Sequence, residues 1–308
     1  MRIAIMAAGA LGGYFGARFA AAGHDVIFFA RGAHRAAIEK NGLRIESPLG
    51  NLHLPKVTLA DDPAKIGTVD IILFAVKLWD LEKAASELAP LIGPATRVIT
   101  VQNGVDALAR LEPILGKGRV VCGLAQIATV ISEPGVIKHT SQFALLRFGH
   151  YDNHPDLTLD AFVEAARKIN LDIALSDNML RDSWIKFTFL TALAGITAAT
   201  RRPIGPLLAD ADGRALFHDL MAEIVAVGRA KGVPLPENFA DERMGFADTV
   251  LPKDMKASMA HDLERGNRIE LDWLTGKVVE LGREVGIATP ANAALYAVLK
   301  PYRMGKSA

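Results

Sequence analysis

The first thirty residues, MRIAIMAAGALGGYFGARFAAAGHDVIFFA, carry the pattern that most restricts the fold of this chain. A short apolar run at residues 3–6 leads into glycines at positions 9, 12, 13 and 16, and helix-compatible residues continue as far as Gly23. A second apolar run follows at residues 24–30. Strand, glycine-rich turn, helix and strand, in this order, form the first unit of a doubly wound parallel sheet. The chain is therefore predicted to begin with a Rossmann-type α/β domain.

The turn itself reads AAGALG, whereas a dinucleotide-binding turn usually reads G-x-G-x-x-G. The first position needs a small residue for a tight turn, the second needs glycine so that backbone can approach a pyrophosphate, and the third needs glycine for close helix packing. Ala7 is small enough for the first role, and Gly9 and Gly12 keep the other two. The predicted cofactor-binding turn consists of Ala7, Ala8, Gly9, Ala10, Leu11 and Gly12.

A secretory signal peptide is the alternative for this stretch, because Arg2 precedes an apolar run and small residues. A signal peptide needs none of these glycines and is not expected to continue into a second strand. The dinucleotide-binding turn is therefore the favoured interpretation.

The end of the second predicted strand bears on which dinucleotide binds. An NAD site commonly places Asp or Glu about 20 residues beyond the glycines, where it accepts the ribose 2′-hydroxyl. Here the segment reads FFARGAHR, so that Arg31, with His34 and Arg35 nearby, offers positive donors and no carboxylate. A solvated arginine at a strand end is the alternative. The sequence favours NADP(H) over NAD(H).

Later apolar runs at residues 69–77, 97–104 and 119–131 extend the predicted parallel sheet. Lys77 and Asn103 lie at the carboxyl ends of the first two, where ligands bind to open parallel sheets. An ordinary strand-end cation and an Asn-Gly turn are the alternatives for these residues. Helix-compatible segments dominate from residue 178 to residue 300. We expect an NADP(H)-binding domain over residues 1–176 and an all-α catalytic domain over residues 177–308.

Composition excludes several classes of function. The 35 basic and 34 acidic residues nearly cancel, so the net charge of +1 gives no general attraction to nucleic acid or to an anionic membrane. A single cysteine, Cys122, cannot form an intrachain disulfide or a CxxC metal site. The apolar stretch at residues 184–200 is short for a membrane span and contains Lys186, so it is predicted to be a buried helix. These features predict a cytoplasmic protein without a structural metal.

Two charged residues lie on predicted apolar helix faces. Lys186 is surrounded in sequence by Trp184, Phe187 and other apolar residues, and Glu270 precedes Leu274 by four residues in a 3.6-residue pattern. An unpaired charge buried on such a face is costly. Lys186 and Glu270 are either a buried structural ion pair or an acid with its orienting carboxylate in a substrate site.

Five short motifs occur in order along the chain. They are AAGALG, Ala75-Val76-Lys77, Gln102-Asn103-Gly104, Trp184-Ile185-Lys186 and Ile269-Glu270-Leu271-Asp272-Trp273. With them the chain resembles the ketopantoate reductase family over essentially its whole length. The resemblance implies reduction of 2-dehydropantoate to pantoate with NADPH. It also implies a Rossmann domain followed by a helical domain, an active site between them, and a homodimer.

The resemblance also implies roles for individual residues. Lys186 would be the general acid, and Glu270 the carboxylate near the nicotinamide and the substrate hydroxyl. Asn103 would contact both cofactor and substrate, and Lys77 and Arg31 would belong to the cofactor site. Ser258 would hold the substrate carboxylate. These residue types suit the chemistry, because hydride transfer to a ketone builds negative charge on oxygen that an ammonium can stabilise and protonate.

The chain departs from the family pattern at three positions. The family commonly has asparagines that bind polar groups of the substrate where this chain has Leu190, Ala194 and Ile204. Loss of these amides would leave a hydroxylated acid without hydrogen-bond partners. The nearby polar residues that could substitute are Thr191, Thr197, Arg201 and Arg202. We therefore consider a less polar 2-oxo acid as an alternative substrate.

The sequence predicts an NADPH-dependent 2-oxo acid reductase, with 2-dehydropantoate as the leading substrate. Two other functions remain open on the sequence alone. Reductive formation of a C–N bond on an imine would need a site for an amine, and none can be identified from the sequence. A non-catalytic NADP(H)-binding protein would have little use for Lys186 and Glu270 on apolar faces.

Overall fold

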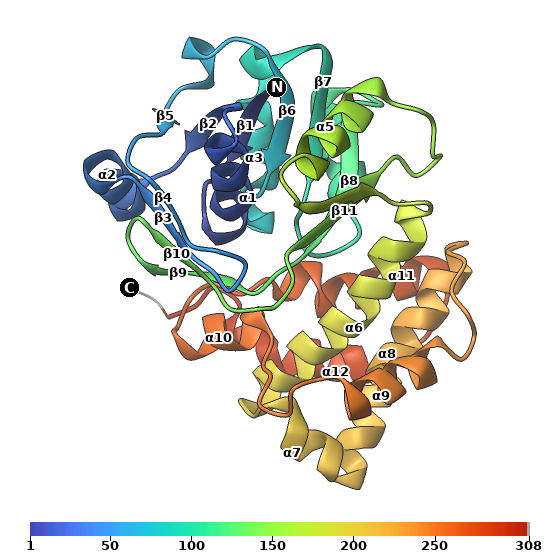
Figure 1. Ribbon diagram of the computed structural model, residues 1–308. Coiled ribbons are helices and arrows are strands. Elements are labelled where there is room, and N and C mark those ends of the chain that lie inside the picture. The colour runs from blue at the N-terminus through green and yellow to red at the C-terminus, as the bar shows by residue number, and fades with distance from the viewer. Residues whose placement is uncertain (307–308) are drawn as a thin grey trace. The chain divides into compact units, whose positions relative to one another are not determined.

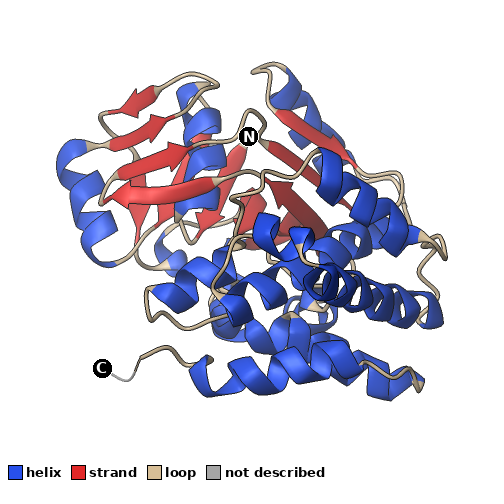
Figure 2. Cartoon of the chain, turned by 90° about the horizontal axis from the view of Figure 1, so that it is seen from below, coloured by secondary structure: helices blue, strands red, loops and turns tan. Residues whose placement is uncertain are grey.

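The computed structural model describes residues 1–306 and divides into two compact units. The sheet unit comprises residues 1–102 and 106–179, and the helical unit comprises residues 103–105 and those from 180 onward. The described strands all belong to the sheet unit, and the helical unit contains helices and their connections (Figures 1 and 2). The predicted fold class, a Rossmann-type parallel sheet followed by an all-α domain, is confirmed. The domain boundary expected from the sequence lies at residue 176.

The sheet unit is built on an eight-stranded sheet with the strand order β12-β11-β8-β7-β6-β1-β2-β5. Its strands are β1 (Arg2–Met6), β2 (Asp25–Phe29), β5 (Thr58–Ala60), β6 (Val69–Phe74), β7 (Ile92–Thr100), β8 (Val120–Gln126), β11 (Leu145–Gly149) and β12 (Asp172–Leu175). Neighbouring strands are parallel except for β8 and β11, which are antiparallel. The strand order reverses about β1, which is the topology of a doubly wound fold.

Helices cover both faces of this sheet (Figure 1). Alternate residues of β6 point to opposite faces, so that Ile71 and Leu73 join one core cluster and Ile72 and Phe74 another. The first cluster contains residues of α1 (Ala10–Ala21) and α5 (Leu157–Arg167), and the second contains residues of α3 (Leu81–Ser86) and α4 (Ala107–Leu115). The remaining helical elements are α2 (Gly32–Asn41), η1 (Pro63–Lys65), η2 (Leu78–Asp80) and η3 (Ala89–Leu91). Burial on both faces explains why these strands read as continuous apolar runs.

A second, four-stranded sheet was not predicted from the sequence. Its order is β4 (Leu52–Leu54), β3 (Leu43–Glu46), β10 (Val136–His139) and β9 (Thr129–Glu133). The apolar run at residues 119–131, read as one strand, is therefore two strands in different sheets, β8 and β9. Burial changes where the chain passes from one sheet to the other, since β8 is mostly buried and β9 is mostly exposed.

Helix α1 packs against β1 and β2 of the large sheet and also against the small sheet. A Cβ atom at Gly12 would lie 2.7 Å from the carbonyl oxygen of Ala7 and 2.9 Å from Cγ2 of Ile5. A Cβ atom at Gly13 would collide with Cδ1 of Ile137 in β10. Two successive glycines therefore let the helix approach a sheet on each side, and only Gly12 belongs to the nucleotide-binding pattern.

The helical unit is centred on the long helix α6 (Met179–Thr200), as predicted for the apolar stretch at residues 184–200. Buried threonines on α6 donate to backbone carbonyls four residues earlier, Thr188 to Trp184 and Thr197 to Leu193, which satisfies their hydroxyl groups. The other elements are α7 (Ile204–Ala209), α8 (Ala211–Ala230), α9 (Phe239–Thr249), α10 (Ser258–Glu264), η4 (Leu271–Trp273), α11 (Thr275–Val285), α12 (Pro290–Leu299) and η5 (Lys300–Tyr302).

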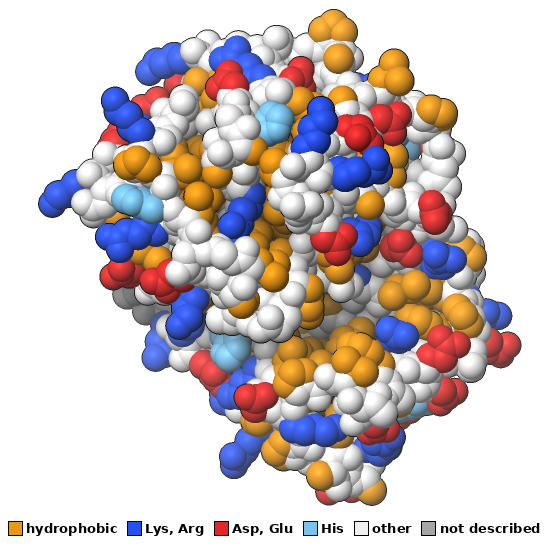
Figure 3. Space-filling model, viewed as in Figure 1, with side chains coloured by type: hydrophobic (Ala, Val, Ile, Leu, Met, Phe, Trp, Pro, Cys, Tyr) orange, Lys and Arg blue, Asp and Glu red, His pale blue; other side chains and the backbone are white. Residues whose placement is uncertain are grey.

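The surface agrees with the near-zero net charge. On the face shown in Figure 3, basic and acidic side chains are interspersed and no extended patch of one sign is present. Among residues 1–306, no helix is both long and apolar enough to span a membrane.

Substitution of Gly12 by alanine is predicted to destabilise the protein. The added methyl group meets the Ala7 carbonyl at 2.7 Å, and such overpacking costs about 1–3 kcal/mol. The better helix propensity of alanine offsets only about 1 kcal/mol of this cost. Gly245→Ala is the matched control, because a methyl group added at this helical glycine would have no atom within 4 Å. Urea unfolding should show a lower midpoint for Gly12→Ala and an unchanged or higher midpoint for Gly245→Ala.

Candidate functional site

The turn after β1 has the geometry of an anion-binding loop. Helix α1 begins at Ala10 with Gly9 as its N-cap, and no side chain caps its first backbone N–H groups. A Cβ atom at Gly9 would have nothing within 4 Å, so the backbone here is open to a close-lying group. Exposed N–H groups and the positive end of the helix dipole favour a phosphate at such a position. The predicted turn therefore fits a pyrophosphate.

Ala7 adopts a conformation that its residue type does not predict. Its φ of 69° lies in the left-handed region, which residues other than glycine rarely adopt. Small size is thus not the only property required at position 7, because the glycine usual at this position also adopts the left-handed conformation without strain. The next residue, Ala8, donates its N–H to the carbonyl of Phe29 at 2.8 Å, which ties the turn to the end of β2.

The basic residues after β2 have different surroundings. Arg31 is the N-cap of α2, its side chain is 79% exposed, and its Nη2 lies 3.9 Å from Oε2 of Glu87. His34 is half-buried and accepts a hydrogen bond from the backbone N–H of Gly135, and burial lowers its pKa. Arg35 donates to the carbonyl of Ala60 at 2.9 Å. Of the three, Arg31 is therefore the residue best placed to meet a phosphate in solvent.

Lys77 and Gln102 lie beyond the carboxyl ends of β6 and β7. Lys77 is the exposed N-cap of η2, and its Nζ lies 5.5 Å from the ring centroid of Trp79. The amide of Gln102 donates to the carbonyl oxygens of Phe74 at 2.7 Å and Val76 at 3.2 Å. Gln102 thus fixes the path of the chain that presents Lys77. In the sequence Gln102 stands out only as part of the Gln102-Asn103-Gly104 motif, which indicates no separate role for it.

Lys186, Glu270 and Asn103 come together within the helical unit. Lys186 is half-buried on α6, and burial lowers its pKa to about 8 while the charge of Glu270 acts in the opposite direction. Glu270 is only 9% exposed, and its Oε2 accepts a hydrogen bond of 3.4 Å from Nδ2 of Asn103. A carboxylate, an ammonium and an amide are thus gathered from three distant parts of the sequence.

The predicted position of Glu270 on an amphipathic helix is wrong. Glu270 is the N-cap of the short turn η4, and α11 begins only at Thr275. The backbone carbonyl of Glu270 accepts from the N–H groups of Trp273 and Leu274, both at 3.2 Å. The four-residue spacing from Glu270 to Leu274 therefore reflects this turn, and only the later part of the pattern belongs to a helix.

The turn that carries Glu270 is held by the C-terminal part of the chain. The backbone N–H of Ile269 donates to the carbonyl of Arg303 at 3.1 Å. The hydroxyl of Tyr296 donates to Oδ1 of Asp272 at 2.8 Å, and the same ring packs where Gly276 leaves room for it. These contacts position Glu270, and no sequence pattern indicated them.

The other predicted substrate residues differ in accessibility. Ser258 is exposed at the first position of α10. Leu190 is half-buried, whereas Ala194 and Ile204 are 1% and 0% exposed and belong to the core of the helical unit. The candidate substitutes are either buried, as Thr191 and Thr197 are, or exposed, as Arg201 and Arg202 are. Arg201 lies over the ring of Tyr302, 5.3 Å from its centroid.

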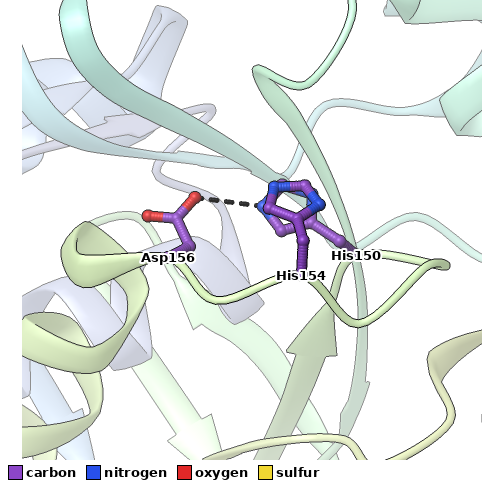
Figure 4. Close-up of side chains that lie close together, drawn as sticks. All are labelled: His150, His154 and Asp156. Carbon is purple, nitrogen blue, oxygen red and sulfur yellow. Dashed lines mark hydrogen bonds and ion pairs between the residues drawn. The ribbon is translucent and has the colours of Figure 1, made fainter.

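A cluster of His150, His154 and Asp156 in the sheet unit has the residue types of a metal site (Figure 4). The carboxylate of Asp156 and the imidazole of His150 are instead bonded to other groups of the chain. Oδ1 of Asp156 accepts from two backbone N–H groups at the start of α5, and Oδ2 accepts from His150 and from Arg97. The imidazole rings of His150 and His154 are stacked, with centroids 3.8 Å apart, so their in-plane lone pairs do not converge. The cluster is best explained as a helix cap and ion pair, and we assign it no metal.

Comparisons with known proteins agree over nearly the whole chain. The family model described as "Ketopantoate reductase PanE/ApbA" matches residues 3–153, and the model of its C-terminal part matches residues 178–303. A 2-dehydropantoate 2-reductase of Mesorhizobium japonicum is 32% identical, covering 97% of each chain. An uncharacterized oxidoreductase of Bacillus subtilis, YkpB, is 31% identical over 99% of this chain and 100% of its own.

Among solved structures, a PanE/ApbA family ketopantoate reductase from Ralstonia eutropha is similar with a TM-score of 0.88. It is 32% identical in sequence, and the similarity covers 98% of each chain. The likeness therefore extends to both units, each of which matches the corresponding part of the relatives.

Substitution of Ala7 by glycine is predicted to stabilise the protein. A left-handed conformation costs a residue other than glycine about 1–2 kcal/mol, and the greater freedom of glycine in the unfolded chain offsets about 0.4–1 kcal/mol of the gain. The net effect should be a modest rise in the free energy of unfolding, measured with urea. Ala8→Gly is the matched control, since Ala8 is buried and does not have a positive φ. A lower free energy of unfolding for Ala7→Gly than for wild type would show that the left-handed conformation of Ala7 is not strained.

Proposed function

The chain belongs to the ketopantoate reductase family, and from that premise we propose that it reduces a 2-oxo acid to the 2-hydroxy acid with NADPH, using Lys186 as the general acid. The chain is thus an oxidoreductase whose particular reaction is proposed here. The observation that carries the proposal is the group formed by Lys186, Glu270 and Asn103, in which burial lowers the pKa of the lysine to about 8. A proton donor with a pKa near the working pH is suited to general acid catalysis.

The residues of this group have distinct tasks in the reaction. When bound, the reduced nicotinamide supplies the hydride. Because its pKa is about 8, Lys186 is mostly protonated at pH 7, and its ammonium stabilises and protonates the oxygen that becomes the hydroxyl. The negative charge of Glu270 favours the protonated form of Lys186. Asn103 donates to Glu270 and thereby orients the carboxylate.

NADP(H) is the proposed cofactor, because the residues of the sheet unit fit it. The uncapped N-terminus of α1 and the open backbone at Gly9 suit a pyrophosphate. The exposed guanidinium of Arg31 suits a 2′-phosphate, and Lys77 adds a second exposed cation beyond β6. No carboxylate stands in place of Arg31 to accept a ribose hydroxyl.

The leading substrate remains 2-dehydropantoate, by membership of the family. A less polar 2-oxo acid is the second candidate, because none of the three substituted positions carries an amide that could bind a hydroxyl group. Ala194 and Ile204 are packed in an apolar core, and Leu190 presents a half-buried aliphatic side chain one helical turn from Lys186. Ser258, exposed at the start of α10, is available to the substrate carboxylate. A homodimer and a cytoplasmic location stay predictions.

The substrate is tested by following NADPH oxidation with 2-dehydropantoate, 2-oxoisovalerate and benzoylformate, and by repeating the series with NADH. We expect turnover of at least one acid, a preference for NADPH, and a loss of about 100- to 10,000-fold in kcat for Lys186→Ala. Lys117→Ala, which removes an exposed lysine, should retain wild-type rates. Preference for the two simpler acids would identify Leu190, Ala194 and Ile204 as a change of specificity. NADPH binding without turnover of any acid would favour the imine or the non-catalytic alternative.

The pH dependence of reduction is predicted from the pKa of Lys186. Because the acid must carry its proton, kcat/KM should be constant well below pH 8, reach half its maximum near pH 8 and keep falling at higher pH. Glu270→Gln removes the charge that raises this pKa, so the fall should begin at a lower pH. Glu280→Gln, which removes the charge of an exposed carboxylate, is the control and should leave the pH profile unchanged. An identical profile in wild type and Glu270→Gln would exclude Lys186 as the titrating acid.

A further inference from the structure

Ser47, His139 and Ser141 form a hydrogen-bonded group at one end of the small sheet. Ser47 directly follows β3 and His139 is the last residue of β10, so the parallel pairing of these two strands brings the side chains together. Oγ of Ser47 lies 2.8 Å from Nδ1 of His139, and Oγ of Ser141 lies 2.8 Å from Nε2 of the same ring. A serine hydroxyl bonded to an imidazole is the arrangement of a nucleophile with its general base.

The other hydrogen bonds of this group fix which nitrogen of His139 carries the proton. The hydroxyl of Ser141 donates to the carbonyl oxygen of Phe143 at 2.6 Å, so it can only accept from the imidazole. The same carbonyl oxygen, which cannot donate, lies 3.1 Å from Nε2 of His139. Both neighbours of Nε2 therefore require a proton on that nitrogen. In the neutral ring Nδ1 is then the acceptor, and the hydroxyl of Ser47 donates to it.

The surroundings of His139 favour a neutral imidazole and hold its orientation. The residue is only 2% exposed, and burial lowers its pKa, as the positive charge of Arg18 also does. The ring of Tyr14 packs edge to face against the imidazole, with centroids 4.9 Å apart. A neutral imidazole in a fixed orientation can take the proton of Ser47, whereas a protonated one cannot.

Ser47 lies in a turn that solvent can reach. The residue is partly exposed, and residues 48–50 after it are exposed. The backbone N–H of Leu49 donates to Oγ of Ser47 at 3.0 Å, and Nη2 of Arg18 donates to the carbonyl of Gly50 at 2.6 Å. A guanidinium therefore stands beside the turn that carries the hydroxyl. Its charge suits a carbonyl oxygen on which negative charge develops when a nucleophile attacks.

Two exposed apolar side chains flank the group. Leu49 is 49% exposed and Phe143 is 53% exposed. The backbone of each is bonded to the group, since the N–H of Leu49 donates to Ser47 and the carbonyl of Phe143 faces His139. Single exposed apolar side chains are common, but these two belong to the two loops that supply the serine and the partners of the histidine. They suit contact with the hydrocarbon part of an acyl group on Ser47.

We propose that Ser47 is an activated nucleophile that accepts an apolar acyl group from a carboxylic ester, with His139 as its general base. Oγ of Ser47 attacks the carbonyl carbon while its proton moves to Nδ1 of His139. The bond between the carbonyl carbon and the leaving oxygen then breaks, and His139 returns the proton to that oxygen. The products are acyl-Ser47 and the free alcohol. This modification site uses none of the residues assigned to the reduction.

The site is tested with p-nitrophenyl butyrate, an ester with a short apolar acyl group. Mass spectrometry after brief exposure should find the butyryl group on Ser47, formed about 100-fold faster than on Ser86 of the same molecule. Ser86 is the matched control, because it is an exposed serine whose hydroxyl donates to the backbone carbonyl of Lys83 instead of a histidine. Release of p-nitrophenolate, followed by absorbance, should be slower in Ser47→Ala and unchanged in Ser86→Ala.

A second variant tests the role of the imidazole. His139→Gln keeps a polar side chain but removes the base, so acylation of Ser47 should slow by about 100-fold. Equal rates of acylation at Ser47 and Ser86 in wild type, or an unchanged rate at Ser47 in the folded His139→Gln variant, would overturn the proposal. The comparison of the two serines needs no variant and therefore decides even if His139→Gln does not fold.

Discussion

The close approach of α1 to β1 is the constraint on which the sheet unit depends. A methyl group at Gly12 would strike both the Ala7 carbonyl and the Ile5 side chain, so the helix can lie this near only because position 12 has no side chain. This approach fixes where the helix begins and obliges the chain to turn sharply at Ala7. The uncapped N–H groups of α1 then face outward beside the end of β2, where Arg31 follows. Packing of the core thus determines the geometry of the turn at residues 7–12.

The helical unit depends on a different constraint, the burial of opposite charges. Lys186 occupies an otherwise apolar stretch of α6, and the low polarity there favours its neutral form. Glu270 opposes this effect, but only because its turn is held by backbone and side-chain bonds from residues 296–303. The pKa of about 8 for Lys186 therefore results from a balance between desolvation, which lowers it, and the charge of Glu270, which raises it. The contacts that hold η4 therefore also influence the pKa of Lys186.

The sequence predicted features that arise from local pattern or from chemical type. Continuous apolar runs located β1, β2, β6 and β7, and the burial cost of a charge singled out Lys186 and Glu270. The sequence could not predict features that depend on contacts between distant parts of the chain. The small sheet joins residues 43–54 with residues 129–139, and the Glu270 turn is held by residues 296–303. The positive φ of Ala7 is also not predictable from its residue type, because alanine is small enough for the turn but rarely adopts the left-handed conformation.

The three substituted positions bear on how this chain would recognise its proposed substrate. Asparagine amides bind hydroxyl groups because they both donate and accept hydrogen bonds. In this chain Ala194 and Ile204 are buried in the core of the helical unit, and Leu190 is half-buried on α6. Aliphatic side chains offer no hydrogen bonds, so a hydroxylated substrate would need its hydrogen-bond partners elsewhere in the site.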